Sequence, residues 1–71
     1  MRLFLLIGQI SPKAKKNPGD WKTISQPTEE KQKVFDTFFN LVEKDDKTFQ
    51  ELRLINTNEG LERRHIFDPI L

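Results

Sequence analysis

Apolar residues gather in separate stretches of the chain, and the spacing within each stretch predicts a different element. Residues 3–7 are continuously apolar and end at Gly8. A short run of this kind is typical of a strand covered on both faces, and Phe4 and Ile7 favour a strand over a helix. We therefore expect a central strand at about residues 2–10.

The clearest pattern predicts a helix at about residues 28–44. Its apolar residues recur at the spacing of one helical face. They are Val34, Phe35, Phe38, Leu41 and Val42. Thr28 precedes Glu29 and Glu30, so we expect its hydroxyl to cap free amides of the first turn. The two acids would interact favourably with the positive end of the helix dipole.

The segment between these two stretches predicts a loop followed by a short strand. Residues 11–20 have no periodic apolar pattern and contain Pro12, Pro18 and Gly19, which are typical turn residues. Residues 21–25 then predict a short strand at the edge of a sheet.

Residues 48–67 fit a β-hairpin. Leu52 and Leu54 alternate with Arg53, as in a strand with one covered face. Residues 56–60 are rich in types that tolerate left-handed conformations, which is typical of the turn that joins two strands.

The same segment also fits a short helix. Residues 48–51 match a capping box, and Phe49, Leu52 and Ile55 have helical spacing. Leu61 and Ile66 have opposite parity, so a regular strand would place them on opposite faces unless a bulge intervened. We favour the hairpin over the helix.

Together these elements predict an α+β fold. One amphipathic helix would pack on a small three- or four-stranded, mostly antiparallel sheet, with the elements in the order ββαββ. Residues 1–71 would form a single small domain, which buries only about 60% of its unfolded surface and has a thin stability margin. Because the chain has no Cys and one His, disulfides and zinc sites of the usual type cannot compensate.

Charge and hydropathy bear on whether the protein binds membranes or nucleic acid and on its cellular location. Twelve basic and eleven acidic residues give a net charge of +1, too small to create a global field that favours nucleic acid or a membrane surface. The first apolar run is too short to span a bilayer and lacks the pattern of a signal peptide. We therefore expect a cytoplasmic protein that does not bind membranes.

The sequence offers little material for catalysis or for a cofactor. His65, the single imidazole, would need a nucleophile and an orienting acid nearby to act as a general base. Ser11 and Ser25 stand outside any nucleophile-elbow pattern, and the three glycines are too scattered for a phosphate-binding loop. We expect no enzyme and no cofactor, and a hydrolase or nuclease that uses His65 is the least favoured hypothesis.

The favoured hypothesis is a protein-interaction module, such as an inhibitor, an adaptor or an assembly factor of the kind that mobile genetic elements also encode. Trp21 and Phe39 fall at margins of the expected core, where they either seal its rim or anchor a partner. Arg63 and Arg64 would add polar contacts. The partner would be another protein or a second copy of the chain.

The alternative hypothesis is a nucleic-acid-binding accessory protein. Basic residues cluster in the first loop and on the last expected strand, where they could contact phosphates while Trp21 stacks on a base. They are Lys13, Lys15, Lys16, Lys22, Arg63 and Arg64. The balance of acids and bases favours the protein partner.

Overall fold

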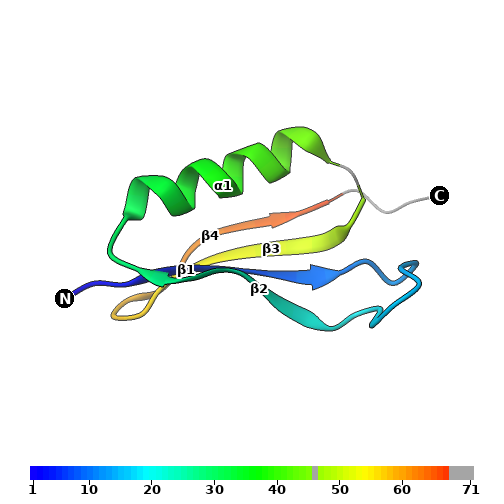
Figure 1. The fold of residues 1–71 in the computed structure, drawn as a ribbon, viewed down its shortest axis with the longest axis horizontal. Helices are drawn as coiled ribbons and strands as arrows, with labels where there is room; N and C mark the ends of the chain where they lie inside the picture. Colours follow the sequence, from blue (N-terminus) through cyan, green and yellow to red (C-terminus); the bar gives the residue numbers. More distant parts are fainter. Residues whose placement is uncertain (46, 68–71) are drawn as a thin grey trace.

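A computed structural model, which describes residues 1–45 and 47–67, shows one helix on one face of a four-stranded antiparallel sheet (Figure 1). In chain order the elements are β1 (Phe4–Ile10), β2 (Trp21–Thr28), α1 (Lys31–Lys44), β3 (Phe49–Asn56) and β4 (Gly60–Ile66). The predicted α+β class is confirmed. The expected ββαββ order describes the chain but not the sheet, in which the strands stand in the order β2-β1-β3-β4.

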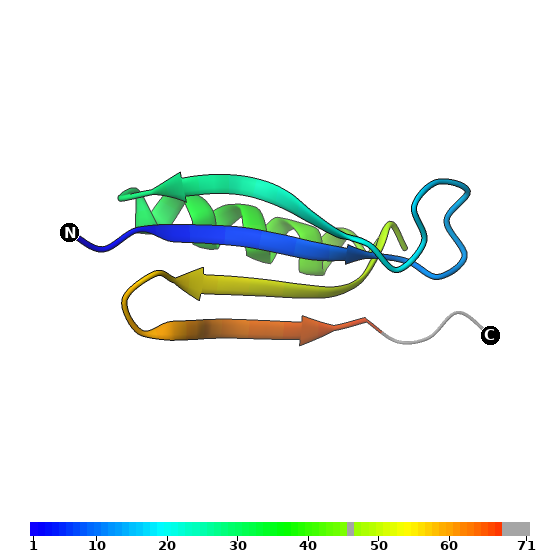
Figure 2. The same cartoon turned by 90° about the horizontal axis from the view of Figure 1, so that it is seen from below.

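The first apolar run forms the central strand β1, which pairs with β2 on one side and β3 on the other. Phe4 and Leu6 are buried beneath α1, whereas Leu5 and Ile7 point to the other face and remain partly exposed. The expected cover on both faces is therefore wrong. Figure 2 shows the sheet with α1 behind it and no second layer in front.

The core lies between α1 and the two central strands, β1 and β3, on which the helix packs. Val34 and Phe38 are the buried residues of α1, and the predicted apolar face of the helix is thus confirmed. The buried apolar side chains are Phe4, Leu6, Val34, Phe38, Leu52, Leu54 and Phe67.

Gly8 permits close packing at one end of this core. A Cβ atom at Gly8 would lie 2.7 Å from Cδ1 of Phe49 and 2.8 Å from Cδ1 of Ile24, closer than such atoms approach one another. The missing side chain therefore lets residues from β3 and β2 meet over the central strand.

The helix begins later than predicted. Thr28 is the last residue of β2, where it lies opposite Phe4, and its extended backbone cannot also belong to a helix. Its hydroxyl oxygen accepts a hydrogen bond from the Glu30 amide at 3.2 Å, and α1 starts at Lys31. The edge strand predicted at residues 21–25 is confirmed as an edge and extends to Thr28, because pairing with β1 continues that far.

The β-hairpin predicted in residues 48–67 is confirmed. The side-chain oxygen of Asn56 accepts hydrogen bonds from the amides of Asn58 at 2.9 Å and Glu59 at 3.3 Å, an arrangement that stabilises a turn. Gly60 closes the turn with φ of 93°, a conformation that costs glycine little.

A β-bulge in β4 allows Leu61 and Ile66 to lie on the same face despite their opposite parity. Leu54 lies opposite Arg63, and the next residue of β3, Ile55, lies opposite Leu61. Glu62 is therefore the extra residue of the bulge, which brings Leu61 to the same face as Ile66.

Leu52 is fully buried, so we expect Leu52→Ala to lower the free energy of unfolding by about 2–5 kcal/mol. Leu61→Ala removes the same atoms from a side chain that is 56% exposed, and we expect it to change stability by less than about 0.5 kcal/mol. Urea denaturation of both variants checks this difference. Equal losses would contradict the burial pattern.

Candidate functional site

The face of the sheet opposite α1, here called the open face, carries the candidate site. Leu6 and Leu54 lie opposite each other and are buried under the helix. Because side chains alternate along a strand, Ile7 and Arg53, which also lie opposite each other, point to the open face. Among the described residues, no element covers this face (Figure 2).

Strand register arranges the side chains of the open face in rows that cross the sheet. The first row holds Trp21, Gln9, Glu51 and Ile66. The second row holds Thr23, Ile7, Arg53 and Arg64. The third row holds Leu5, Ile55 and Leu61. The charged groups thus lie in the first two rows, and the third row is apolar.

Large apolar side chains remain in contact with solvent on this face. Trp21 is 42% exposed, Leu61 is 56% exposed and Ile66 is 59% exposed. They come from the two edge strands, β2 and β4, whereas Ile7 and Ile55 of the central strands are partly buried between them. The exposed apolar side chains thus stand at the two edges of the open face, with the charged side chains between them.

A chain of polar contacts connects the two edges of the open face. The Glu51 carboxylate accepts hydrogen bonds from Nε of Arg53 at 2.6 Å and from Nε of Arg64 at 2.8 Å. The Arg53 guanidinium also lies over the Trp21 ring, 4.6 Å from its centroid. We call these four residues the Trp–Arg belt.

Electrostatics keep the Trp–Arg belt ionised. The hydrogen bond from Arg64 lowers the pKa of Glu51, and Arg53 adds to this effect, while burial opposes it. The same contact raises the pKa of Arg64. Two guanidinium groups around one carboxylate leave one net positive charge, held by hydrogen bonds to that carboxylate.

The structure brings together only part of the predicted protein-binding set. Trp21 and Arg64 both belong to the Trp–Arg belt. Phe39 is 48% exposed but lies on α1, on the other side of the sheet, beside Phe38 at 5.5 Å between ring centroids. Arg63 lies opposite the buried Leu54 and so points to the helix side of β4.

Sequence reasoning missed the two central members of the Trp–Arg belt, Glu51 and Arg53. Their spacing of two residues in a strand indicates a shared face, and this signal was present in the sequence. Their contacts with Trp21 and Arg64 depend on which strands flank β3 and in which register, and no local pattern gives that information.

The polar residues considered for catalysis lie apart from the belt. The His65 ring packs edge to face against Phe67, with 4.7 Å between centroids, on the helix side of β4. Ser11 is buried, and its hydroxyl oxygen accepts a hydrogen bond from the Lys13 amide at 3.3 Å. Within residues 1–45 and 47–67, no three acidic or histidine side chains form a group that could hold a metal ion.

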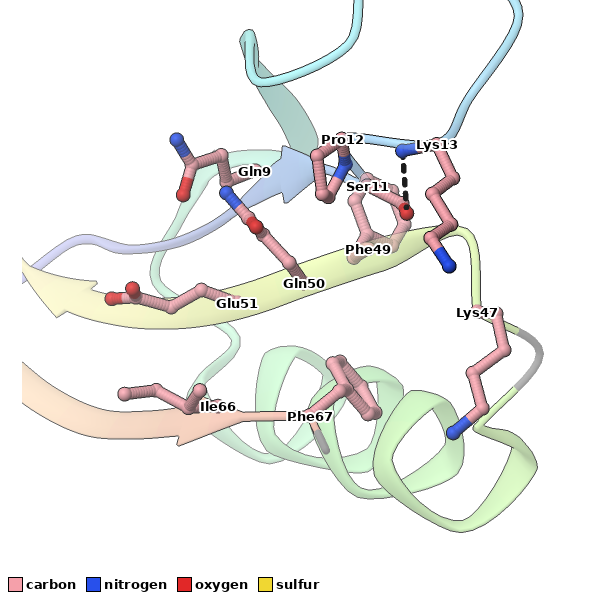
Figure 3. A pocket seen from close by; sticks show the side chains of 10 residues that line it. All are labelled: Gln9, Ser11, Pro12, Lys13, Lys47, Phe49, Gln50, Glu51, Ile66 and Phe67. Atoms are coloured by element: carbon pink, nitrogen blue, oxygen red, sulfur yellow. Dashed lines mark hydrogen bonds between the residues drawn. The ribbon is translucent and has the colours of Figure 1, made fainter. Parts of the chain in front are cut away.

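A hollow of about 410 Å³ opens at the end of the sheet where β1 ends and β3 begins (Figure 3). Phe49, Ile66 and Phe67 supply its apolar lining, and Glu51 connects it to the Trp–Arg belt. The other lining residues are Gln9, Ser11, Pro12, Lys13, Lys47 and Gln50.

A second hollow of about 400 Å³ gathers part of the predicted nucleic-acid-binding set. Lys16 and Lys22 line it together with Lys47 and Phe49. The remaining members of the set are distributed elsewhere. Lys13 lines the first hollow, Lys15 is exposed in the loop, and Arg63 and Arg64 lie on β4.

Comparisons of the chain with protein-family models, with curated proteins and with solved structures find no match. In the described part of the chain, no helix has the length and apolar character needed to cross a membrane.

The lowered pKa of Glu51 predicts a pH-dependent part of the stability. This contribution is present above the ordinary pKa of glutamate and is lost as the pH falls through the lowered pKa of the folded state. We expect the unfolding free energy of the wild type to fall over this acidic range and that of Glu51→Gln to fall less. Urea denaturation at a series of pH values measures both slopes, and identical slopes would contradict the assignment.

Proposed function

We propose that the protein is a non-enzymatic, cytoplasmic interaction module that binds another protein through its open face. The observation that carries this proposal is the Trp–Arg belt, in which a half-exposed indole and two guanidinium groups are held in one connected arrangement. Tryptophan and arginine are the residues that most often dominate binding energy at protein interfaces.

The surroundings of the belt support a protein partner. Leu61 and Ile66 supply apolar contact area on either side of Arg64, so a partner could bury a mixed surface of the kind that interfaces use. Because Glu51 already orients both arginines, they would lose little conformational freedom on binding. Such a module would act by occupying its partner, as an inhibitor, an adaptor or an assembly factor does.

Trp21 and Phe39 provide a matched pair for testing this assignment, because both are exposed aromatics but lie on opposite layers of the fold. We expect Trp21→Ala to reduce partner capture from a lysate of the native host at least tenfold, and Phe39→Ala to leave it unchanged. Capture is measured by affinity pull-down with quantitative mass spectrometry, and circular dichroism confirms that both variants fold.

Three outcomes would count against the open face. Capture that survives Trp21→Ala removes the belt from the interface. Capture lost only in Phe39→Ala moves the interface to α1. Equal loss in both variants, with both folded, indicates that neither layer is selective.

A second candidate function, nucleic-acid binding, is favoured by the second hollow, which Lys16 and Lys22 line beside Phe49, together with Lys47, whose ammonium group is paired with Asp45 at 3.0 Å. Lysine ammonium groups attract backbone phosphates, and the aromatic ring could contact a base. Lys22 also follows Trp21 directly in the chain, at the start of β2.

If this candidate is right, we expect a fluorescent single-stranded oligonucleotide to bind with an affinity that falls steeply as salt increases. The double variant Lys16→Glu, Lys22→Glu should weaken binding at least tenfold at low salt, whereas the charge-matched double variant Lys33→Glu, Lys44→Glu on α1 should have a small effect. Fluorescence anisotropy measures the affinities. Absence of binding by the wild type at low salt excludes this function.

A further inference from the structure

The outer edge of β4 borders the open face. In the sheet order β2-β1-β3-β4, no other strand of the described part of the chain pairs with the outer side of β2 or of β4, so both outer strands have backbone groups on one side that make no strand pairing. The Phe67 amide donates to the Gln50 carbonyl at 3.0 Å, so the inward-facing positions alternate from Phe67 back along β4. The amides and carbonyls of Arg64 and Ile66 consequently face the free edge.

The two edges differ in how well they could accept another strand. β2 contains Pro27, which has no amide hydrogen to donate, and its pairing with β1 has two register shifts. β4 has no proline and one bulge, at Glu62. The segment from Arg63 to Ile66 is therefore the regular, accessible edge of the sheet.

The side chains of β4, above all the positive charge of Arg63, favour one kind of added strand. Arg63 and His65 project on the helix side of this strand, and Arg63 is exposed. The one acid of β4, Glu62, accepts a hydrogen bond from the Asn56 side chain at 3.2 Å. On the open face the same edge presents the apolar Leu61 and Ile66 together with Arg64.

We propose that β4 accepts an extended, acidic segment of a partner protein as a fifth, antiparallel strand. Its acidic side chains would lie opposite Arg63 and His65 on the helix side, and its apolar side chains would extend the open face beside Leu61 and Ile66. This inference rests on the proposed protein-binding function and specifies the chemistry of the partner.

A second copy of the chain fits this edge less well. Antiparallel pairings centred on Arg63 or on Arg64 place two arginines directly opposite each other. A pairing centred on His65 places Arg63 opposite Phe67, so none of the three gives Arg63 an acidic partner. Like charges in directly opposed positions destabilise a strand pair. Charge complementarity therefore favours a foreign acidic strand over self-association.

The probe that matches both faces is an eight-residue capped peptide of alternating glutamate and valine, (Glu-Val)4. We expect it to bind the full chain with the largest amide shifts at Arg64 and Ile66 in ¹H–¹⁵N spectra. Peptide N-methylation on the valines, which would face the Arg64 and Ile66 backbone, should abolish binding. N-methylation on the glutamates, whose amides would point away, should be tolerated.

Charge variants test the acidic preference. We expect Arg63→Glu to weaken (Glu-Val)4 binding about tenfold and (Lys-Val)4 to bind the wild type at least tenfold more weakly than (Glu-Val)4. Lys15→Glu, in the exposed loop, is the control for the change of net charge and should leave the affinity within twofold.

The proposal is overturned if (Glu-Val)4 fails to bind at millimolar concentration, or if both N-methylated peptides bind alike. It is also overturned if Arg63→Glu and Lys15→Glu have equal effects, or if sedimentation shows a dimer that Arg63→Glu changes. Partner capture that depends on Trp21 but not on Arg63 would retain the interaction module and remove only the added strand.

Discussion

One helix cannot cover both sides of a four-stranded sheet, and the rest of the molecule follows from this constraint. The 14 residues of α1 shield the helix side of β1 and β3, where the fully buried leucines lie. The opposite face is then exposed to solvent, although β1 is apolar throughout its first half. Partial burial of Ile7 and Ile55 between neighbouring side chains, without a second layer, is how this sheet meets that requirement.

The Trp–Arg belt shields part of the apolar surface that this face exposes to solvent. Arg53 covers part of the Trp21 ring, and Glu51 fixes the guanidinium groups on both sides, so apolar area is shielded by aligned charges. Surface ion pairs contribute little to stability when they stand alone, but a connected set also pre-orients its members. Pre-orientation is the property that an interface anchor requires, and it ties the structural role of the belt to its proposed function.

The bulge in β4 determines what this face presents at its edge. Without the extra residue Glu62, Leu61 would point toward the helix side and the open face would have an apolar group at one end of β4 only. With it, Leu61 and Ile66 flank Arg64. The same strand carries the regular free edge, so the surface of side chains and the row of free backbone groups are adjacent and a single partner could use both.

The sequence by itself determined the elements, because helical spacing around Val34 and Phe38 and turn residues at 56–60 are local signals. It could not place Thr28, since pairing with Phe4 extended β2 into the expected first turn of the helix. The grouping of Trp21 with Arg64, and the separation of both from Phe39, were decided by strand order. Contacts between strands distant in the chain depend on which edges pair and in which register, and only the tertiary structure specifies these.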